Sequence, residues 1–328
     1  MKINLLITGG AGFIGSNLVE RFLNDDRIGL VRVLDDLSNG LYENIAPFEF
    51  HPKFEFIEGD ICDYATCQAA MKGIHKVTHQ AALGSVPRSI ENPMRTNEVN
   101  VGGTVNILHA AKEAGVDRVV LAFSSSTYGD SKELPKVEHR IGNPLSPYAV
   151  SKLAAEHYAQ VFCRTYGLNF VGLRYFNIFG PKQNPDNPYA AVIPLFCRAF
   201  IEDQQPRING DGTHSRDFTF VENVLHANDL ALFTDNSEAV NQVYNVACGD
   251  QVTLNEMVDM LRQITGKNIQ PQYGPERPGD VKHSNADITK IRTKLGYEPQ
   301  VYMFEGMKRV YEWSQKVYEE RRAVIQSA

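Results

Sequence analysis

A tyrosine and a lysine spaced four residues apart have the side chains needed for acid–base chemistry. Tyr148 and Lys152 follow Pro147, and proline is common at the first position of a helix, so a helix starting here would place both side chains on one face. To act as a base near neutrality, a tyrosine with an ordinary pKa of about 10 needs that pKa lowered by roughly 3, which corresponds to about 4 kcal/mol. A lysine charge favours the phenolate and could supply part of this energy. A second pair with the same spacing, Tyr128 and Lys132, lies where no helix is expected, so the spacing alone identifies no site.

A glycine-rich turn near the start of the chain has the features of a dinucleotide-binding turn. It follows the strand-like run Ile3–Thr8 and contains Gly9, Gly12 and Gly15. Such glycines permit a tight turn and let backbone N–H groups approach a pyrophosphate at a helix N-terminus, although an ordinary tight turn can also use them. Asp35 follows the next strand, where a carboxylate can accept hydrogen bonds from an adenosine ribose. The adjacent Asp36 adds negative charge that would repel a 2′-phosphate, so the predicted cofactor is NAD rather than NADP.

Hydroxyl side chains follow the apolar strand 118–123, beginning at Ser124 and continuing to Thr127. The carboxyl ends of parallel strands face the crevice in which doubly wound folds bind ligands. These residues could therefore contact a substrate, or they could equally form an ordinary polar loop.

The elements that must position these residues are apolar, β-rich runs that alternate with helical patterns, the rhythm of βαβ units. This rhythm predicts an α/β fold with a doubly wound parallel (Rossmann) sheet and a smaller, interleaved C-terminal α/β substrate domain. The expected strands are Ile3–Thr8, Leu30–Leu34, Phe54–Glu58, Lys76–His79, Arg118–Phe123, Asn169–Arg174 and Val243–Val246. A proline-rich stretch after Asn177 marks a domain boundary. Residues 1–176, with a return segment at 216–246, are predicted to form the NAD-binding domain, and residues 177–215 and 247–328 the substrate domain, which ends in small helices and an amphipathic helix at about 304–321.

Composition and charge exclude several classes of protein. The chain has 328 residues, 43% of them hydrophobic, enough to bury roughly three quarters of the surface of its unfolded form. Its net charge is −6 and it has no extended basic cluster, so nucleic acid is not an expected partner. No signal peptide and no run of 18 apolar residues is found, which predicts a cytoplasmic protein without a membrane partner. Its five scattered cysteines include no C-x-x-C and predict reduced thiols rather than a disulfide framework or a structural zinc site, and no metal is expected.

Together, these residues resemble the extended short-chain dehydrogenase/reductase family, and within it the nucleotide-sugar 4-epimerases. The resemblance covers nearly the whole chain, through Thr8–Gly15, Asp60-Ile61, His79–Ala82, Ser124–Gly129, Tyr148–Lys152, Arg174–Gly180, Ser215–Asp217 and Arg277–Asp280. It is closest to the bacterial UDP-N-acetylglucosamine 4-epimerase group, through Ala82–Ser89, Ser124–Asp130 and Ile208–Gly212.

This resemblance implies roles for individual residues. Tyr148 is the expected acid/base, Lys152 its electrostatic partner together with the positive nicotinamide ring, and Ser124 the hydroxyl that polarises the sugar C4 oxygen. The implied cofactor-binding residues are Gly9, Gly12, Phe13, Ile14, Gly15, Asp35, Asp36, Ser38, Asn39, Gly40, Asp60, Ile61, Ala81, Ala82, Asn100, Tyr148, Lys152 and Tyr175. The implied substrate-binding residues are Gly84, Ser85, Ser125, Ser126, Asn177, Ala191, Val192, Arg216, Arg277, Asp280 and Ser284. The arginines would hold the diphosphate of UDP through charge-assisted hydrogen bonds.

The reaction implied by the resemblance is NAD-dependent C4 epimerisation of UDP-hexoses through a transient 4-keto sugar. UDP-GlcNAc/UDP-GalNAc interconversion is favoured because Ser284, at a wall position of the sugar pocket, is small. Elimination is disfavoured because no glutamate follows Ser124, and UDP-uronates because Asn177 and Asn184 stand where uronate epimerases typically carry threonine and arginine. UDP-glucose or UDP-uronate 4-epimerisation remains an alternative, as does a non-catalytic NAD-sensing protein, since a fold does not prove activity.

The resemblance also implies an assembly and a cellular role. The expected assembly is a homodimer in which helices near 101–114 and 148–166 form a four-helix bundle. The expected role is in polysaccharide biosynthesis.

Overall fold

A seven-stranded parallel sheet forms the centre of the protein. The structure is a computed structural model and describes residues 2–183, 191–276 and 282–327. The strands lie in the order β11-β6-β5-β4-β1-β2-β3, and every pairing between them is parallel. They are β1 (Ile3–Thr8), β2 (Ile28–Asp35), β3 (Phe54–Glu58), β4 (Lys76–His79), β5 (Arg118–Ser124), β6 (Phe170–Tyr175) and β11 (Gln242–Val246). The predicted doubly wound sheet is confirmed, and each expected strand is present, although β2 begins earlier than expected, at Ile28.

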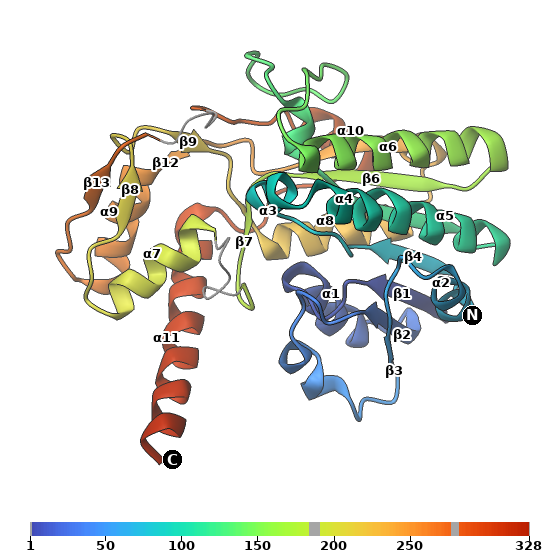
Figure 1. Cartoon of the computed structure of the whole chain (residues 1–328), viewed down its shortest axis with the longest axis horizontal. Coiled ribbons are helices and arrows are strands. Elements are labelled where there is room, and N and C mark those ends of the chain that lie inside the picture. Colours follow the sequence, from blue (N-terminus) through green and yellow to red (C-terminus); the bar gives the residue numbers. More distant parts are fainter. Residues whose placement is uncertain (1, 184–190, 277–281, 328) are drawn as a thin grey trace.

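Helices cover both faces of this sheet (Figure 1). One face packs against α1 (Phe13–Leu23) and α8 (Val221–Phe233), and the other against α2 (Tyr64–Met71), α5 (Thr104–Glu113) and α6 (Pro147–Tyr166). Successive side chains of a strand point to opposite faces, so Leu5 and Ile7 of β1 are buried on the first face and Leu6 on the second. The strands therefore read as continuous apolar runs because both of their faces are buried.

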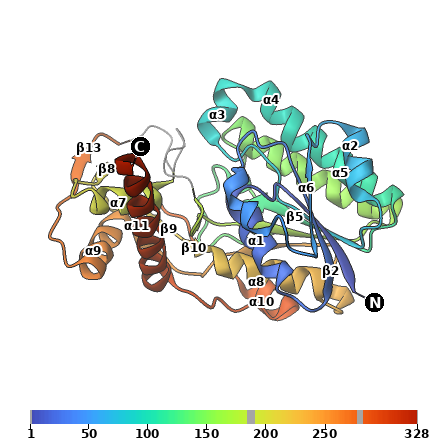
Figure 2. The same ribbon diagram turned by 90° about the horizontal axis from the view of Figure 1, so that it is seen from below.

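Three helices and several short strands form a second, smaller group of elements beside the large sheet and its helices (Figure 2). The helices are α7 (Val192–Ile201), α9 (Leu254–Thr265) and α11 (Met303–Ser327). The short strands pair as β13 (Gln272–Gly274) with β8 (Arg207–Asn209), β12 (Val252–Thr253) with β9 (Ser215–Arg216), and β10 (Thr219–Phe220) with β7 (Ile178–Phe179). A separate hydrophobic cluster joins these helices, with Phe196, Met257 and Met307 among its buried members. Within the three described ranges, no helix is long and apolar enough to cross a lipid bilayer.

The C-terminal part of the chain differs from its expected form in two respects. Helix α11 has 25 residues and extends beyond the expected helix to Ser327, and the apolar residues of its first half pack against both α7 and α9. Helix α10 (Thr289–Leu295) packs against β11, and its residues Ile291 and Leu295 belong to the core of the large sheet. The domain boundaries themselves stay a prediction.

A buried ion pair joins α6 to the sheet. The guanidinium of Arg174 on β6 donates two hydrogen bonds, of 3.0 and 2.7 Å, to the carboxylate of Glu156, and both side chains are almost fully buried. The same guanidinium donates to the Tyr128 hydroxyl at 3.0 Å and to the Glu138 carbonyl oxygen at 2.9 Å. The Tyr128 hydroxyl in turn donates to Asn245 on β11 at 2.6 Å. One arginine therefore connects α6, the turn after β5 and the edge strand of the sheet.

We expect Glu156→Gln to lower the free energy of unfolding by about 3 kcal/mol, because it leaves the buried Arg174 charge without a counterion. The matched control is Glu133→Gln, which breaks an exposed ion pair with Arg140 and should cost less than about 1 kcal/mol. Urea unfolding of both variants measures the difference. Equal losses of unfolding free energy in the two variants would show that the buried ion pair stabilises the fold no more than the exposed one.

Candidate active site

A cavity of about 940 Å³ opens at the carboxyl ends of the parallel strands. This is the edge at which doubly wound folds bind their ligands. Its wall takes in the glycine-rich turn, the end of β2, the turn after β5 and the start of α6. The cavity has the size of a cofactor site. Its lining residues range across the sheet, from those that follow β3 to those at the end of β6.

The glycine-rich turn leaves no space for side chains. A Cβ atom on Gly15 would lie 2.1 Å from the Gly9 carbonyl oxygen, and one on Gly9 would lie 2.7 Å from the Ala81 nitrogen. Gly9 also has a φ of +69°, which favours glycine. Helix α1 begins directly after Gly12 with no side-chain cap, and Phe13, Ile14 and Gly15 of its first turn line the cavity. An uncapped helix N-terminus facing a cavity fits the pyrophosphate of a dinucleotide.

Asp35 ends β2 inside the same cavity wall. Its carboxylate accepts hydrogen bonds from the backbone N–H groups of Ala11 and Leu37, both at 2.9 Å, so it also shapes the turn around the cofactor site. Burial raises the pKa of Asp35, and these two hydrogen bonds oppose that effect because they favour the carboxylate. The geometry fits an adenosine ribose hydrogen-bonded to this carboxylate.

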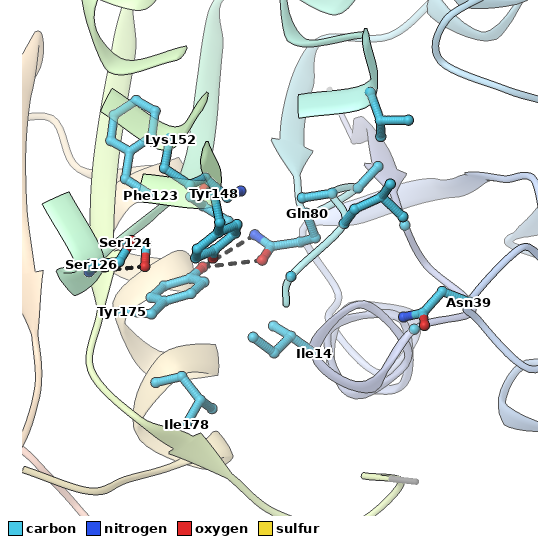
Figure 3. A pocket seen from close by; sticks show the side chains of 18 of the residues that line it. Ile14, Asn39, Gln80, Phe123, Ser124, Ser126, Tyr148, Lys152, Tyr175 and Ile178 are labelled. Carbon is cyan, nitrogen blue, oxygen red and sulfur yellow. Dashed lines mark hydrogen bonds between the residues drawn. The ribbon is translucent and has the colours of Figure 1, made fainter. Parts of the chain in front are cut away.

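Ser124, Tyr148 and Lys152 lie on one side of the cavity (Figure 3). Helix α6 begins at Pro147 and is capped by Ser146, whose hydroxyl accepts the Ala149 N–H at 3.1 Å, and this cap places Tyr148 in the first turn. Ser124 is the last residue of β5. Tyr128 of the second tyrosine–lysine pair is instead a buried partner of Asn245, which accounts for its place in the structure without a catalytic role.

In the protein without cofactor, the pKa of Tyr148 is shifted upward, whereas the expected shift is downward. Burial raises the pKa of Tyr148, and a hydrogen bond with the Ser124 side chain acts in the opposite direction. The Lys152 ammonium donates to the Ala122 carbonyl oxygen at 3.0 Å, and burial lowers the pKa of Lys152 to about 8. The expected lowering of the Tyr148 pKa by Lys152 is therefore absent from the protein alone, since burial disfavours the phenolate and the lysine is bonded to a strand carbonyl.

Tyr175 also lines the cavity, close to Tyr148 and with its hydroxyl bonded to Gln80 (Figure 3). Its hydroxyl accepts hydrogen bonds from Asn228 at 2.9 Å and from the side-chain amide of Gln80 at 3.2 Å. Gln80 itself lines the cavity, although it is not among the residues expected at the site. Its position within His79–Ala82, one of the motifs that carry the family resemblance, is the sequence signal that points to it.

A second cavity of about 760 Å³ lies next to the first and contains part of the predicted substrate site. Ala191 and Val192 line this second cavity, whereas Asn177 and Arg216 line both. The two cavities are therefore contiguous at the end of β6. The second cavity is also lined by three residues that were not expected there, Arg207, Asn209 and His214, on β8 and the following loop.

Most of the predicted site residues surround the first cavity, and their individual roles stay predictions. The first cavity is lined by Gly9, Gly12, Phe13, Ile14, Gly15, Asp35, Asp36, Ser38, Asn39, Gly40, Asp60, Ile61, Ala81, Ala82, Gly84, Ser124, Ser125, Ser126, Tyr148, Lys152, Tyr175 and Ser284, besides the two shared residues. Arg277 and Asp280, like Asn184, lie outside the described residues.

Two predicted residues are not part of either cavity wall. Asn100 is buried, and its side-chain amide bonds both backbone groups of Leu83 and the hydroxyl of Ser151. The Ser85 hydroxyl accepts the Arg88 N–H and caps the short helix α3 (Val86–Glu91). Both side chains hold the segment after β4, and α3 contributes Val86, Pro87 and Ile90 to the cavity wall.

Comparisons with known proteins agree with this architecture. Residues 5–247 match the model of the NAD dependent epimerase/dehydratase family. A UDP-glucose 4-epimerase of Mycolicibacterium smegmatis is 36% identical over 315 residues, covering 94% of this chain and 97% of its own.

Two solved structures are similar over nearly their full length. A UDP-N-acetylglucosamine 4-epimerase from Methanobrevibacter ruminantium in complex with UDP-N-acetylmuramic acid has a TM-score of 0.90 and 37% identity, covering 97% of this chain and 100% of that one. A UDP-glucuronic acid 4-epimerase from Bacillus cereus in complex with UDP-glucuronic acid and NAD has a TM-score of 0.89 and 30% identity, covering 96% and 100%. The family expected from the sequence is confirmed: the chain belongs to the NAD-dependent epimerase/dehydratase family.

Proposed function

We propose that the protein is a UDP-sugar 4-epimerase that uses NAD and interconverts UDP-GlcNAc and UDP-GalNAc. The observation that carries this proposal is that Asn177 and Arg216 line both cavities, so that a nucleotide sugar in the second cavity would extend toward Ser124 and Tyr148 in the first. Relatives named for different UDP-sugars are similar to 94–97% of this chain, and this similarity supports the reaction class.

The chemistry at the sugar follows from three side chains. Tyr148 takes the proton of the C4 hydroxyl, and Ser124 hydrogen-bonds the C4 oxygen while its charge changes. When bound, NAD supplies the acceptor for the C4 hydride and, in its oxidised form, a positive ring beside the phenol. Lys152, held on the Ala122 carbonyl, adds a second positive charge at this point.

The contacts to the two halves of the substrate must differ in strength. Arg216 and Asn177 hold the UDP, whereas the small residues Gly84 and Ser125 leave the 4-keto ring free to turn over. Tyr148 would return its proton to the C4 oxygen after the ring has turned over. The residues of the glycine-rich turn would hold NAD, which would take up and give back the same hydride, so no second redox substrate would be required.

The choice of sugar rests on Ser284. This half-buried residue lines the first cavity, and its backbone N–H donates to the Ser215 carbonyl oxygen at 3.1 Å. Its short side chain leaves space for a 2-acetamido group in the pocket. UDP-glucose and UDP-glucuronate remain the competing substrates, since relatives with these names have similar coverage.

We also propose that the protein is a homodimer whose interface includes α5 and α6. Three large apolar side chains on α6, Val150, Tyr158 and Val161, are about half exposed. Their spacing places them along one side of the helix, away from the buried Ala155 and Ala159. Association of this apolar stripe with a second copy would bury it in a four-helix bundle.

Tyr148→Phe should retain its fold and bound NAD but lose between about 100-fold and 10,000-fold in turnover, because it removes the acid/base and leaves the ring in place. Tyr166→Phe, on the exposed end of the same helix, is the matched control. Separation of C4 epimers after incubation with UDP-GlcNAc gives both rates. A Tyr148→Phe enzyme with most of its turnover intact would show that the proton acceptor is another group.

Ser284→Tyr should suppress turnover of UDP-GlcNAc and UDP-GalNAc while UDP-Glc and UDP-Gal stay measurable, because bulk at this wall collides with the acetamido group. The wild type should prefer the acetylated pair, and Ser284→Ala should keep that preference. kcat/KM for the four sugars measures both effects. A preference unchanged by tyrosine would exclude Ser284 as the determinant, and a wild type that prefers UDP-Glc would contradict the proposed substrate.

A further inference from the structure

Lys136 is a buried lysine in the wall of the first cavity. It lies on the loop between the turn after β5 and helix α6, it is 5% exposed, and it lines the cavity together with Ser284. Its backbone is paired with a distant segment: its N–H donates to the Asn285 carbonyl oxygen at 2.8 Å, and its carbonyl oxygen accepts the Asp287 N–H at 2.9 Å. Because Asn285 directly follows Ser284, Lys136 and Ser284 belong to the same part of the wall.

The hydrogen bonds of Lys136 leave part of its ammonium group unused. Its Nζ donates to the Ser131 carbonyl oxygen, and no carboxylate among the described residues lies within 4.0 Å of it. An ammonium has three donors, and only this one bond is made to a described residue. Glu133, which is exposed and pairs with Arg140, acts on the Lys136 charge only from a distance. Burying a cation that no carboxylate of the described residues contacts is costly, so this position suits a strong acceptor on a ligand.

We propose that Lys136 donates a hydrogen bond to the carbonyl oxygen of the 2-acetamido group and thereby selects acetylated UDP-sugars. This inference rests on the proposed function. Among the groups of a neutral UDP-hexosamine ring, the amide carbonyl is the strongest acceptor, and Lys136 already bonds an amide carbonyl of the backbone. Its place beside Ser284 puts the donor next to the wall where the acetamido group needs space. Ser284 then admits the group, and Lys136 binds it.

The test compares Lys136→Met, which keeps the apolar stem and removes the charge, with Lys132→Met on the exposed part of the same loop. Lys136→Met should lower kcat/KM for UDP-GlcNAc by about 10-fold to 100-fold and change that for UDP-Glc by less than about 2-fold. UDP-GalNAc must lose the same factor as UDP-GlcNAc, because an enzyme cannot change the equilibrium between the two. Lys132→Met should leave all four values unchanged.

Each remaining outcome has one meaning. Suppose that the wild type epimerises the acetylated pair. The proposed role of Lys136 is then overturned if Lys136→Met lowers kcat/KM equally for all four sugars, or if it leaves the preference for acetylated sugars unchanged. A wild type that prefers UDP-glucuronate and loses this sugar alone in Lys136→Met would show that the ammonium binds a carboxylate instead. A wild type that epimerises no UDP-sugar would contradict the proposed function itself. If Lys136→Met does not fold, Lys136→Gln, which retains a neutral donor, is judged by the same ratio of acetylated to non-acetylated kcat/KM.

Discussion

The position of Tyr148 in the cavity wall depends on the buried ion pair between Arg174 and Glu156. Tyr148, Lys152 and Glu156 follow one another at intervals of four residues, so they lie along one face of α6. Lys152 attaches this face to the Ala122 carbonyl on β5, and Glu156 attaches it to Arg174 on β6. The rotation of α6 about its axis is therefore set by two adjacent strands. Because a charge at Arg174 is tolerable in the core only with its partner in place, the two bonds to Glu156 favour one orientation of the helix and of Tyr148.

The same network extends to the part of the wall assigned to the sugar. Arg174 bonds Tyr128, which bonds Asn245, and the Asn245 side chain donates to the carbonyl oxygens of Lys136 at 2.9 Å and Asp287 at 3.1 Å. The side chains of Arg174, Tyr128 and Asn245 in this network are buried and have partners, as buried polar groups require. Helix α6, the turn that carries Ser124 and the wall next to Ser284 are thus parts of one hydrogen-bonded unit. Arg216 also lines the second cavity, so its proposed contacts to UDP would come from a different direction, which suits a substrate held by its nucleotide while its ring turns.

The parts of this architecture that sequence could predict are those encoded in short segments. Apolar runs such as Leu5–Ile7 mark strands buried on both faces, and the turn from Gly9 to Gly15 encodes its own conformation. Proline and serine at the start of α6 predict where the helix begins. The spacing of tyrosine and lysine, in contrast, occurs twice and by itself does not separate the two pairs, which differ because Tyr148 and Lys152 lie on helix α6 whereas the Tyr128 hydroxyl bonds Asn245. The contacts of Lys136 with residues near 285 and the place of α3 over the cofactor cavity join segments that are distant in sequence, so no local pattern predicts them. The raised pKa of Tyr148 likewise depends on burial by the whole fold.

In the proposed reaction the sugar is oxidised and then reduced at C4 within one active site, by a hydride that never leaves that site. The most direct test is incubation of the wild-type protein in ordinary water with UDP-GlcNAc that carries deuterium at C4. The UDP-GalNAc formed should retain its deuterium at C4, because the transferred hydride does not exchange with solvent. Loss of the label to water would exclude this reaction and would indicate deprotonation at carbon rather than hydride transfer.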